Sequence, residues 1–361
     1  MEITNAVKAY GLKVPKNFGE RAIRLVANLG LLNKDLKVRL IDEHIYVPLK
    51  QKPTFEQVTE FEKELPQSEI LVQEFPKRNK QQKSLYEILE DKLPPHLLAS
   101  FPRSIDFVGE IAIVEVPPEL KEYRKLIGES ILSTHKQIRT VLAKSSAISG
   151  IYRLREYAVI AGVPKTETIH REYGCKYYLD LNKVYFSPRL SYEHYRVASQ
   201  VEYGETVIDM FAGVGPFSIL IAKMHKNATV YAVDINPDAI EYLKKNIRLN
   251  RVEKNVTPIL GDANNVVRTR LKETADRVIM NLPEKADEYL ENACNAIKPV
   301  GGVIHYYTFT EGRASLETIR NRLNEKIDQT RFKVEKILST RLIREVAPYR
   351  WLAVLDIKII R

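Results

Sequence analysis

The sequence has few cysteines, no long apolar run and no clustered histidines. Its two cysteines, Cys175 and Cys294, lie far apart without a neighbouring His/Cys cluster, so we expect ordinary buried or half-buried thiols and neither a disulfide nor a zinc site. The seven histidines show no metal-ligand spacing, and we predict no metal. No apolar run approaches the ~18 residues of a membrane helix. The first residues do not resemble a signal peptide, which predicts a cytoplasmic protein with no membrane partner.

Acidic residues are in the minority. The 361-residue chain has 56 lysines and arginines against 46 aspartates and glutamates, a formal net charge of +10 at pH 7 and an isoelectric point near 9.3. This excess favours a polyanionic partner, and it favours nucleic acid over an acidic membrane because no amphipathic anchor is evident. Charge alone is weak evidence for binding. The length suits two or three domains.

Basic side chains are dense in an N-terminal unit that we place at residues 1–65. Its pattern predicts an amphipathic helix over 18–30 and a hairpin that turns at Asp42 and Glu43. The unit is a candidate module for phosphate contacts, and a solvated small domain is the alternative reading. The basic residues are Lys8, Lys13, Lys16, Arg21, Arg24, Lys34, Lys37 and Arg39.

The rest of the chain is predicted to contain a linker and two domains. We assign the linker to 66–98, because 77–83 has no apolar side chain. A middle α+β domain over 99–186 is expected to contain a strand at 105–114, a long basic helix through Lys136 and Arg139, and strands at 150–162 and 176–186. The last domain, 187–361, is expected to begin with a helix over 190–201 and to end with an apolar strand over 352–360 that closes its sheet.

The most informative segment of that last domain is 207–217. An apolar run ends at Asp209, and Gly213 and Gly215 follow before a helix-forming stretch. A buried strand, a tight turn and a helix in this order bring backbone N–H groups up to a ligand. Ser218 stands where a dinucleotide fingerprint has its third glycine. Asp209 would repel a pyrophosphate and attract a cation, which favours S-adenosylmethionine over a dinucleotide; a structural turn is the alternative.

Three further predicted strands end in polar residues. Asp234 follows the second strand at the place where such folds hold ribose hydroxyls, and Asp262 at the third could accept a hydrogen bond from an adenine amino group. Helix capping explains any one aspartate but not three in register with a glycine loop. The pattern predicts an α/β class I methyltransferase (Rossmann-like) parallel sheet with its ligand at the carboxyl ends of the strands. The expected cofactor-binding residues are Asp209, Phe211, Gly213, Gly215, Asp234, Ile235, Asp262, Ala263 and Asn281.

Three longer motifs resemble a known family. The turn Asn281-Leu282-Pro283 is similar to the Asn-Pro-Pro-Tyr motif of methyltransferases that act on planar amino groups, although Leu282 and Glu284 replace two of its residues. With the stretches 152–162 and 183–193, it makes residues 100–361 resemble the archaeal and eukaryotic tRNA (guanine-N1)-methyltransferases that modify guanosine 37. The N-terminal unit is similar to the extra domain of archaeal members, which grips the outer corner of tRNA. The resemblance implies S-adenosylmethionine as cofactor, tRNA as partner and an RNA-binding middle domain. This fold gives no reason to expect a dimer, so we predict a monomer.

The resemblance also implies residue roles. Methylation of guanine N1 requires removal of its proton, and Glu193 matches the family's general base. Arg153 matches the arginine that stabilises negative charge at O6; Arg155, two residues further on the same face of a predicted strand, is the alternative. Asn281 would hold the purine edge while Pro283 fixes the turn, and Tyr185 would stack on or flank the flipped base. The remaining expected substrate contacts are Pro188, Arg189 and Arg344, the last from a C-terminal segment that mixes cations and aromatics as single-stranded RNA surfaces do.

Other readings stay open. Without the resemblance, Glu193 would be a first-turn helix residue that offsets the helix dipole, and Arg153 would be an ion-pair partner. The nearest rival function is the aminocarboxypropyl transfer of wyosine synthesis, against which the Asn-x-Pro turn argues. Methylation of a carbon in a tricyclic wyosine precursor is a further possibility. A non-catalytic RNA-binding protein is disfavoured by the intact set of cofactor residues, and a small-molecule methyltransferase does not explain the basic N-terminal unit.

Overall fold

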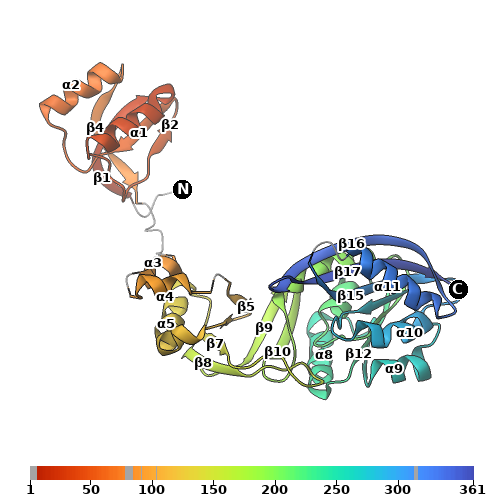
Figure 1. The fold of residues 1–361 in the computed structure, drawn as a ribbon. Helices are drawn as coiled ribbons and strands as arrows, with labels where there is room; N and C mark the ends of the chain where they lie inside the picture. Colours follow the sequence, from red (N-terminus) through yellow and green to blue (C-terminus); the bar gives the residue numbers. More distant parts are fainter. Residues whose placement is uncertain (1–5, 78–83, 91, 103, 313–315) are drawn as a thin grey trace. The chain divides into compact units, whose positions relative to one another are not determined.

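The computed structural model describes residues 6–77, 84–90, 92–102, 104–312 and 316–361. The chain divides into two compact units, Met1–Ser84 and Leu85–Arg361, which are described separately (Figure 1). Within the described residues, no helix is both long enough and apolar enough to cross a membrane.

The N-terminal unit is an antiparallel sheet with the strand order β2-β3-β1-β4 and two helices. The predicted helix and hairpin are present, but the predicted boundary at residue 65 is wrong. Strand β4, which the sequence analysis assigned to a linker, pairs with β1 from Glu69 to Pro76 and buries Phe75 completely. Residues 78–83 of that linker lie outside the described residues. The elements are β1 (Ala6–Pro15), α1 (Gly19–Asn28), β2 (Arg39–Ile41), β3 (His44–Pro48), α2 (Phe55–Glu64) and β4 (Glu69–Pro76).

The second unit begins with a four-stranded sheet in the order β5-β6-β7-β8, in which only β6 and β7 are parallel. Helices α3 and α4, also from the predicted linker, bury Leu89 and Leu98 against α5. The single strand predicted over 105–114 is a hairpin, because Gly109 turns the chain at φ +56°. The predicted long helix ends at Thr134. The elements are α3 (Leu85–Glu90), α4 (Pro95–Ala99), β5 (Asp106–Val108), β6 (Ile111–Val114), α5 (Arg124–Thr134), β7 (Thr140–Lys144) and β8 (Tyr157–Gly162).

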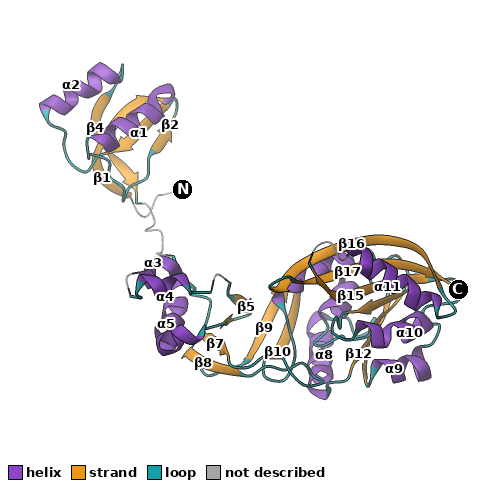
Figure 2. Ribbon diagram, viewed as in Figure 1, coloured by secondary structure: helices purple, strands orange, loops and turns teal. Residues whose placement is uncertain are grey.

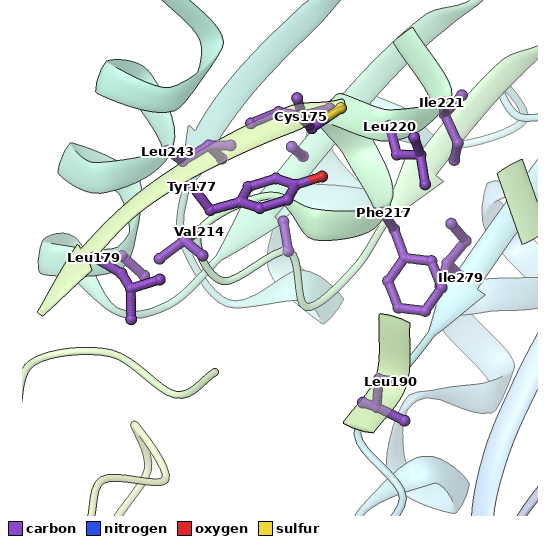
Figure 3. Close-up of a cluster of buried hydrophobic side chains, with 14 of the residues drawn as sticks. Cys175, Tyr177, Leu179, Leu190, Val214, Phe217, Leu220, Ile221, Leu243 and Ile279 are labelled. Carbon is purple, nitrogen blue, oxygen red and sulfur yellow. The ribbon is translucent and has the colours of Figure 1, made fainter. Parts of the chain in front are cut away.

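A two-stranded hairpin, β9 (Glu167–Glu172) and β10 (Cys175–Asp180), turns at Tyr173 and Gly174 as predicted. It packs on the last domain, because Cys175, Tyr177 and Leu179 of β10 point into the core formed with Phe217 and Leu243 (Figure 3). β9 was missed, and β10 ends at Asp180 rather than near 186.

Helix α8 (Pro237–Asn250) takes the place of a neighbouring strand along β10. Asn246 Oδ1 accepts from the Tyr178 N–H at 2.7 Å and its amide donates to the Tyr178 carbonyl at 3.0 Å; Asn250 does the same with Lys176 at 2.9 and 2.7 Å. The two asparagines lie four residues apart, on one face of the helix. They satisfy backbone groups that a strand edge would otherwise leave without partners.

The last domain has a seven-stranded sheet with the order β13-β12-β11-β14-β15-β17-β16, parallel from β13 to β15. β17 pairs antiparallel with β15, and β16, which the sequence analysis missed, forms the edge. The predicted last strand is therefore present but does not close the sheet. The strands are β11 (Thr206–Asp209), β12 (Thr229–Asp234), β13 (Val256–Leu260), β14 (Arg277–Met280), β15 (Gly302–Glu311), β16 (Lys333–Ala347) and β17 (Arg350–Ile360).

Helices cover both faces of this sheet (Figure 2). Val207 faces the core beneath α7 (Pro216–Met224) and α8. Its neighbour Ile208 faces the core beneath α10 (Ala286–Ala296) and α11 (Leu316–Asp328), because side chains alternate along a strand. Gly215, Asn236 and Asp262 stand at the starts of the helices that follow β11, β12 and β13. The helices not yet named are α6 (Ser191–Ala198) and α9 (Ala263–Val266).

Candidate active site

The glycine turn after β11 opens on a cavity. Both glycines have positive φ, +55° at Gly213 and +92° at Gly215. A Cβ on Gly215 would meet Leu243 Cδ1 at 2.5 Å, so this glycine permits the helix to pack closely. A Cβ on Gly213 would meet only the Tyr185 carbonyl oxygen, at 3.7 Å. Gly213 therefore faces open space and leaves room for a ligand beside the backbone.

We call this space the glycine-loop cavity; it has a volume of about 420 Å³. It lies at the carboxyl ends of the parallel strands, where open α/β sheets bind ligands. Seven of the nine residues predicted to bind the cofactor line it: Phe211, Gly213, Asp234, Ile235, Asp262, Ala263 and Asn281. The other two, Asp209 and Gly215, do not reach its wall.

Asp234 is held by backbone amides at the end of β12. One carboxylate oxygen accepts from the Gly213 N–H at 2.7 Å and the other from the Asn236 N–H at 2.8 Å. Burial raises the pKa of Asp234, and these two N–H groups oppose that shift. Since each carboxylate oxygen can accept a second hydrogen bond, Asp234 can still bind hydroxyl groups from the cavity.

Asp262 caps α9 and contacts a tyrosine that the sequence analysis missed. Its Oδ1 accepts from the Asn265 N–H at 3.1 Å, and its Oδ2 accepts from the Tyr289 hydroxyl at 3.1 Å. Tyr289 meets Phe211 edge to face with ring centroids 4.9 Å apart. Burial, followed by the charge of Asp262, raises the pKa of Tyr289 to about 12, so its hydroxyl is a donor at neutral pH. These three side chains form one wall of the cavity.

Asp209 lies behind the glycine turn, fully buried. Its Oδ2 accepts from the Ser218 hydroxyl at 2.7 Å, and its Oδ1 has no hydrogen-bond partner among the described residues. Burial raises the pKa of this carboxyl group to about 7. Ser218, at the position of the missing third glycine, is thus the partner of the acid that precedes the turn.

A second space, the arginine cavity, has a volume of about 460 Å³. It is lined by all five predicted substrate contacts: Arg155, Tyr185, Pro188, Arg189 and Arg344. Lys144 and Arg350 add two further cations that the sequence analysis did not assign to the site. Arg189 is fixed by Asp106 at 2.5 Å and by the Ser104 hydroxyl at 3.2 Å.

The two cavities share a wall, and its polar members include Arg153, Tyr185, Asn281 and Glu284. The Arg153 guanidinium lies 4.8 Å from the ring centroid of Tyr185, and its Nη2 lies 3.4 Å from Glu284 Oε1. Arg153 has φ +56° in a turn before β8, so the strand predicted to carry Arg153 and Arg155 on one face is absent at these positions. Arg155 lines the arginine cavity but not the glycine-loop cavity. Pro283, beside this wall, also lines the arginine cavity.

Glu193 lines neither cavity. It is 1% exposed in the first turn of α6, where its Oε2 accepts from Arg196 Nε at 2.9 Å and from the Tyr307 hydroxyl at 3.0 Å. Arg341 Nη1 lies 3.4 Å from Oε1. Oε1 itself has no hydrogen-bond partner among the described residues. One oxygen of this carboxylate is therefore anchored by two hydrogen bonds, and the other is buried beside Arg341 without one in the described part of the chain.

Arg196, which binds Glu193, is itself connected to side chains of the sheet by ion pairs and hydrogen bonds. Arg196 also donates to both oxygens of Asp356, and Asp356 accepts from His305 Nδ1 at 2.6 Å. Because Arg277 Nη1 donates to His305 Nε2 at 3.0 Å, that nitrogen is the acceptor and Nδ1 carries the proton. Burial lowers the pKa of His305, consistent with a neutral ring.

His194, next to Glu193, faces the glycine-loop cavity instead. Its Nδ1 lies 2.8 Å from Glu172 Oε2, while His170 Nε2 lies 3.1 Å from Oε1 of the same glutamate. Hydrogen bonds from the two imidazoles lower the pKa of Glu172 against the opposing effect of burial. Spacing in the sequence gives no sign of this cluster, because its members come from β9 and α6. Within the described residues, no group of three or more His, Cys, Asp and Glu side chains could hold a metal ion.

The side chains of the basic and aromatic C-terminal segment, residues 341–351, lie in several different environments. Arg344 and Arg350 line the arginine cavity, Arg341 faces Glu193, and the Arg350 guanidinium lies 4.3 Å from the ring centroid of Phe309. Tyr349 is 82% exposed at the tip between β16 and β17. Arg344 and Arg350 thus share one cavity, while Arg341 of the same segment lies against Glu193.

Three family models match this chain. The TRM5/TYW2 methyltransferase domain matches residues 168–335, the TYW2 N-terminal domain matches 85–166, and the tRNA methyltransferase 5 N-terminal domain matches 11–55.

Curated relatives cover most of the chain. The tRNA (guanine(37)-N(1))-methyltransferase Trm5b of Pyrococcus abyssi is 42% identical over 348 residues, which are 96% of this chain and 98% of the relative. The tRNA 4-demethylwyosine(37)-methyltransferase Taw21 of Saccharolobus solfataricus is 40% identical and covers 71% of this chain and 94% of its own. The tRNA(Phe) (4-demethylwyosine(37)-C(7)) aminocarboxypropyltransferase of Methanocaldococcus jannaschii is 34% identical, over 70% of this chain and 96% of the relative.

Solved structures show the same architecture. The crystal structure of Pyrococcus abyssi Trm5b has a TM-score of 0.75 at 41% identity and covers 98% of this chain and 100% of that one. A complex of aTrm5 with tRNALeu has a TM-score of 0.74 at 34% identity, with 97% and 99% covered. Methanocaldococcus jannaschii TYW2 in complex with AdoMet has a TM-score of 0.56 at 31% identity, with 72% and 100% covered. The class I methyltransferase fold predicted from the sequence is confirmed.

Proposed function

Because the chain belongs to the Trm5 family of tRNA methyltransferases, we propose that it transfers a methyl group from S-adenosylmethionine to N1 of guanosine 37 in tRNA. The observation that carries the proposal is the wall shared by the two cavities. One cavity suits a nucleoside cofactor, the other suits a polyanionic substrate, and both end at Arg153, Tyr185, Asn281 and Glu284. A group bound on each side would meet there.

The glycine-loop cavity fits S-adenosylmethionine in size and in chemistry. Its volume of about 420 Å³ lies in the range of small-molecule sites. Asp234 would bind the ribose hydroxyls and Asp262 the adenine amino group, while Phe211 and Ile235 offer apolar surface to the ring. Asp209 and Gly215 support the turn from behind. When bound, the cofactor supplies an electrophilic methyl group.

The residues of the chain then have distinct tasks. Arg153 stabilises the negative charge that develops on O6 as N1 loses its proton. Tyr185 flanks the flipped base, and Asn281 holds the purine edge from a turn that Pro283 fixes. Glu193 accepts the N1 proton through Oε1, the oxygen that has no hydrogen bond among the described residues. Glu193 lines neither cavity here. For Glu193 to accept the proton, either its side chain or the flipped guanine must therefore move after tRNA binds.

The tRNA partner is expected to contact two parts of the chain. The cations of the arginine cavity would bind the anticodon loop, and the basic N-terminal unit would bind the outer corner of the tRNA. We expect the protein to act as a monomer in the cytoplasm. Two buried cysteines without a disulfide are compatible with a reducing compartment.

Nucleoside mass spectrometry tests the proposal. The purified full-length protein, given methyl-labelled S-adenosylmethionine and unmodified tRNA, should produce labelled 1-methylguanosine at position 37 and release S-adenosylhomocysteine. Release of methylthioadenosine, with no methyl group entering the tRNA, would instead identify aminocarboxypropyl transfer and refute the proposal.

A second activity is favoured by the 40% identity to Taw21. The same site could methylate a carbon of a tricyclic wyosine precursor. A tRNA that carries 4-demethylwyosine at position 37 serves as the substrate for this test, and an unchanged nucleoside would exclude the second activity.

A further inference from the structure

Glu284 is the one carboxylate, among the described residues, that lines both cavities. It stands in the loop between β14 and α10, directly after the Asn281-Leu282-Pro283 turn. Glu284 occupies the position of the tyrosine in the Asn-Pro-Pro-Tyr motif and departs from that motif. In the structure it is the acidic member of the wall where cofactor and substrate meet.

Glu284 and Arg153 place an acceptor beside a donor. Glu284 Oε1 lies 3.4 Å from Arg153 Nη2, and Glu284 makes no other hydrogen bond within the described part of the chain. The Arg153 side chain is 15% exposed and rests against Tyr185, while the Glu284 side chain is 44% exposed. A long, partly exposed contact of this kind is weak. A substrate can therefore exchange it for hydrogen bonds of its own at little cost.

Guanine offers the matching pattern on its Watson–Crick edge. O6 is an acceptor, and N1–H and the 2-amino group are donors. Arg153 can serve only as a donor and the Glu284 carboxylate only as an acceptor. With Arg153 at O6, the carboxylate is left for the opposite end of the edge, and N1 between them stays open to the methyl group.

We propose that Glu284 is a specificity-determining residue that accepts a hydrogen bond from the guanine 2-amino group while Arg153 contacts O6. This inference rests on the proposed methylation of guanosine 37. A site built to bind an N–H group rejects an analogue without it, because its own polar group then loses its partner. The Glu284–Arg153 pair thus selects guanosine over purines that lack the 2-amino group.

The experiment compares two tRNA transcripts that differ only in guanosine or inosine at position 37, since inosine keeps O6 and N1–H and lacks the amino group. We expect the unaltered protein to prefer guanosine in kcat/KM. Glu284→Ala should lower that preference about 10-fold, through a slower reaction with guanosine and an unchanged one with inosine. Glu284→Gln, which keeps a neutral acceptor, should lower it less.

Glu288→Ala is the matched control. Glu288 lies four residues further, its side chain is 63% exposed, and among the described residues it pairs only with Lys285. Its removal therefore takes away the same charge outside both cavities. The preference of the Glu288→Ala variant for guanosine should equal that of the unaltered protein. Thermal unfolding of each variant checks that the fold is intact.

Two results would overturn the inference. In one, Glu284→Ala slows both tRNAs by the same factor, which would mean that Glu284 acts only by holding Arg153. In the other, the unaltered protein methylates both tRNAs equally well. Failure of the proposed function gives a different result, namely no methylation of the guanosine tRNA by the unaltered protein, and that result would remove the inference as well.

Discussion

The two cavities of the larger unit differ in the charged side chains that line them, with acids in excess in the glycine-loop cavity and cations in excess in the arginine cavity. Besides Glu284 on the shared wall, the acids of the glycine-loop cavity are Asp234 and Asp262, which come from the ends of neighbouring parallel strands. The arginine cavity has six cations, drawn from β7, from the turn before β8, and from the segments around Pro188 and around the β16–β17 tip. A cationic nucleoside suits the first lining and a phosphate backbone the second. The sheet topology brings Asp234 and Asp262 together, whereas the cations of the arginine cavity come from segments that lie far apart in the chain.

The largest effect is expected at Glu193, which belongs to neither lining. Glu193→Gln should lower kcat about 10²- to 10⁴-fold, because a neutral amide cannot accept the N1 proton. Affinity for S-adenosylmethionine, measured by calorimetry, should stay the same. Near-native turnover would exclude Glu193 as the base and would leave Glu284, the carboxylate on the shared wall, as the next candidate.

The pH dependence of stability tests the protonation of Asp209, the acid behind the glycine-loop cavity. Its pKa is about 7 in the folded protein against an ordinary value of 3.8, so between these values the folded state binds a proton that the unfolded state has lost. The free energy of unfolding should therefore fall as pH rises from about 4 to 7, by up to about 4 kcal/mol from this group.

Urea unfolding across this pH range provides the measurement, with no cofactor added. Asp209→Asn should be more stable than the unaltered protein near pH 7 and should show a flatter dependence on pH. Parallel curves for the two proteins would show that Asp209 does not titrate there.

The shared wall distinguishes Arg153 from Arg155. Arg153 lines both cavities and should contact the reacting base, so Arg153→Ala is expected to lower kcat about 10²-fold. Arg155→Ala should mainly raise KM for tRNA, because Arg155 lines the arginine cavity alone. Steady-state kinetics with varied tRNA separate the two effects, and the reverse pattern would exchange the assigned roles.

The smallest effect is expected from the N-terminal unit. Removing residues 1–84, which include all of its paired strands, should weaken tRNA binding about 10-fold and flatten its dependence on salt, because fewer phosphates are neutralised. Arg344→Ala in the full chain gives a comparison for the arginine cavity. Unchanged affinity and salt slope after the deletion would rule out a tRNA-binding function for this unit.

The glycine-loop cavity was largely predictable because local patterns encode it. Apolar runs that end in Asp209, Asp234 and Asp262 indicate parallel strands, and parallel strands place their ends at one edge of the sheet. Tyr289 escaped prediction because it lies inside α10, where nothing in its neighbours marks it. Asn246 and Asn250 resemble ordinary helix residues, although they provide the hydrogen bonds along β10.

The sequence by itself determined the strand-turn-helix units, the acids at their ends and the family to which the chain belongs. These features depend on neighbouring residues and on side-chain periodicity, both of which are visible along the chain. Only the tertiary structure decided that Glu193 lies behind the cavity walls and that Glu284 and Arg153, 131 residues apart, face each other. Contacts of that kind depend on how separate elements pack, and no local pattern specifies the packing.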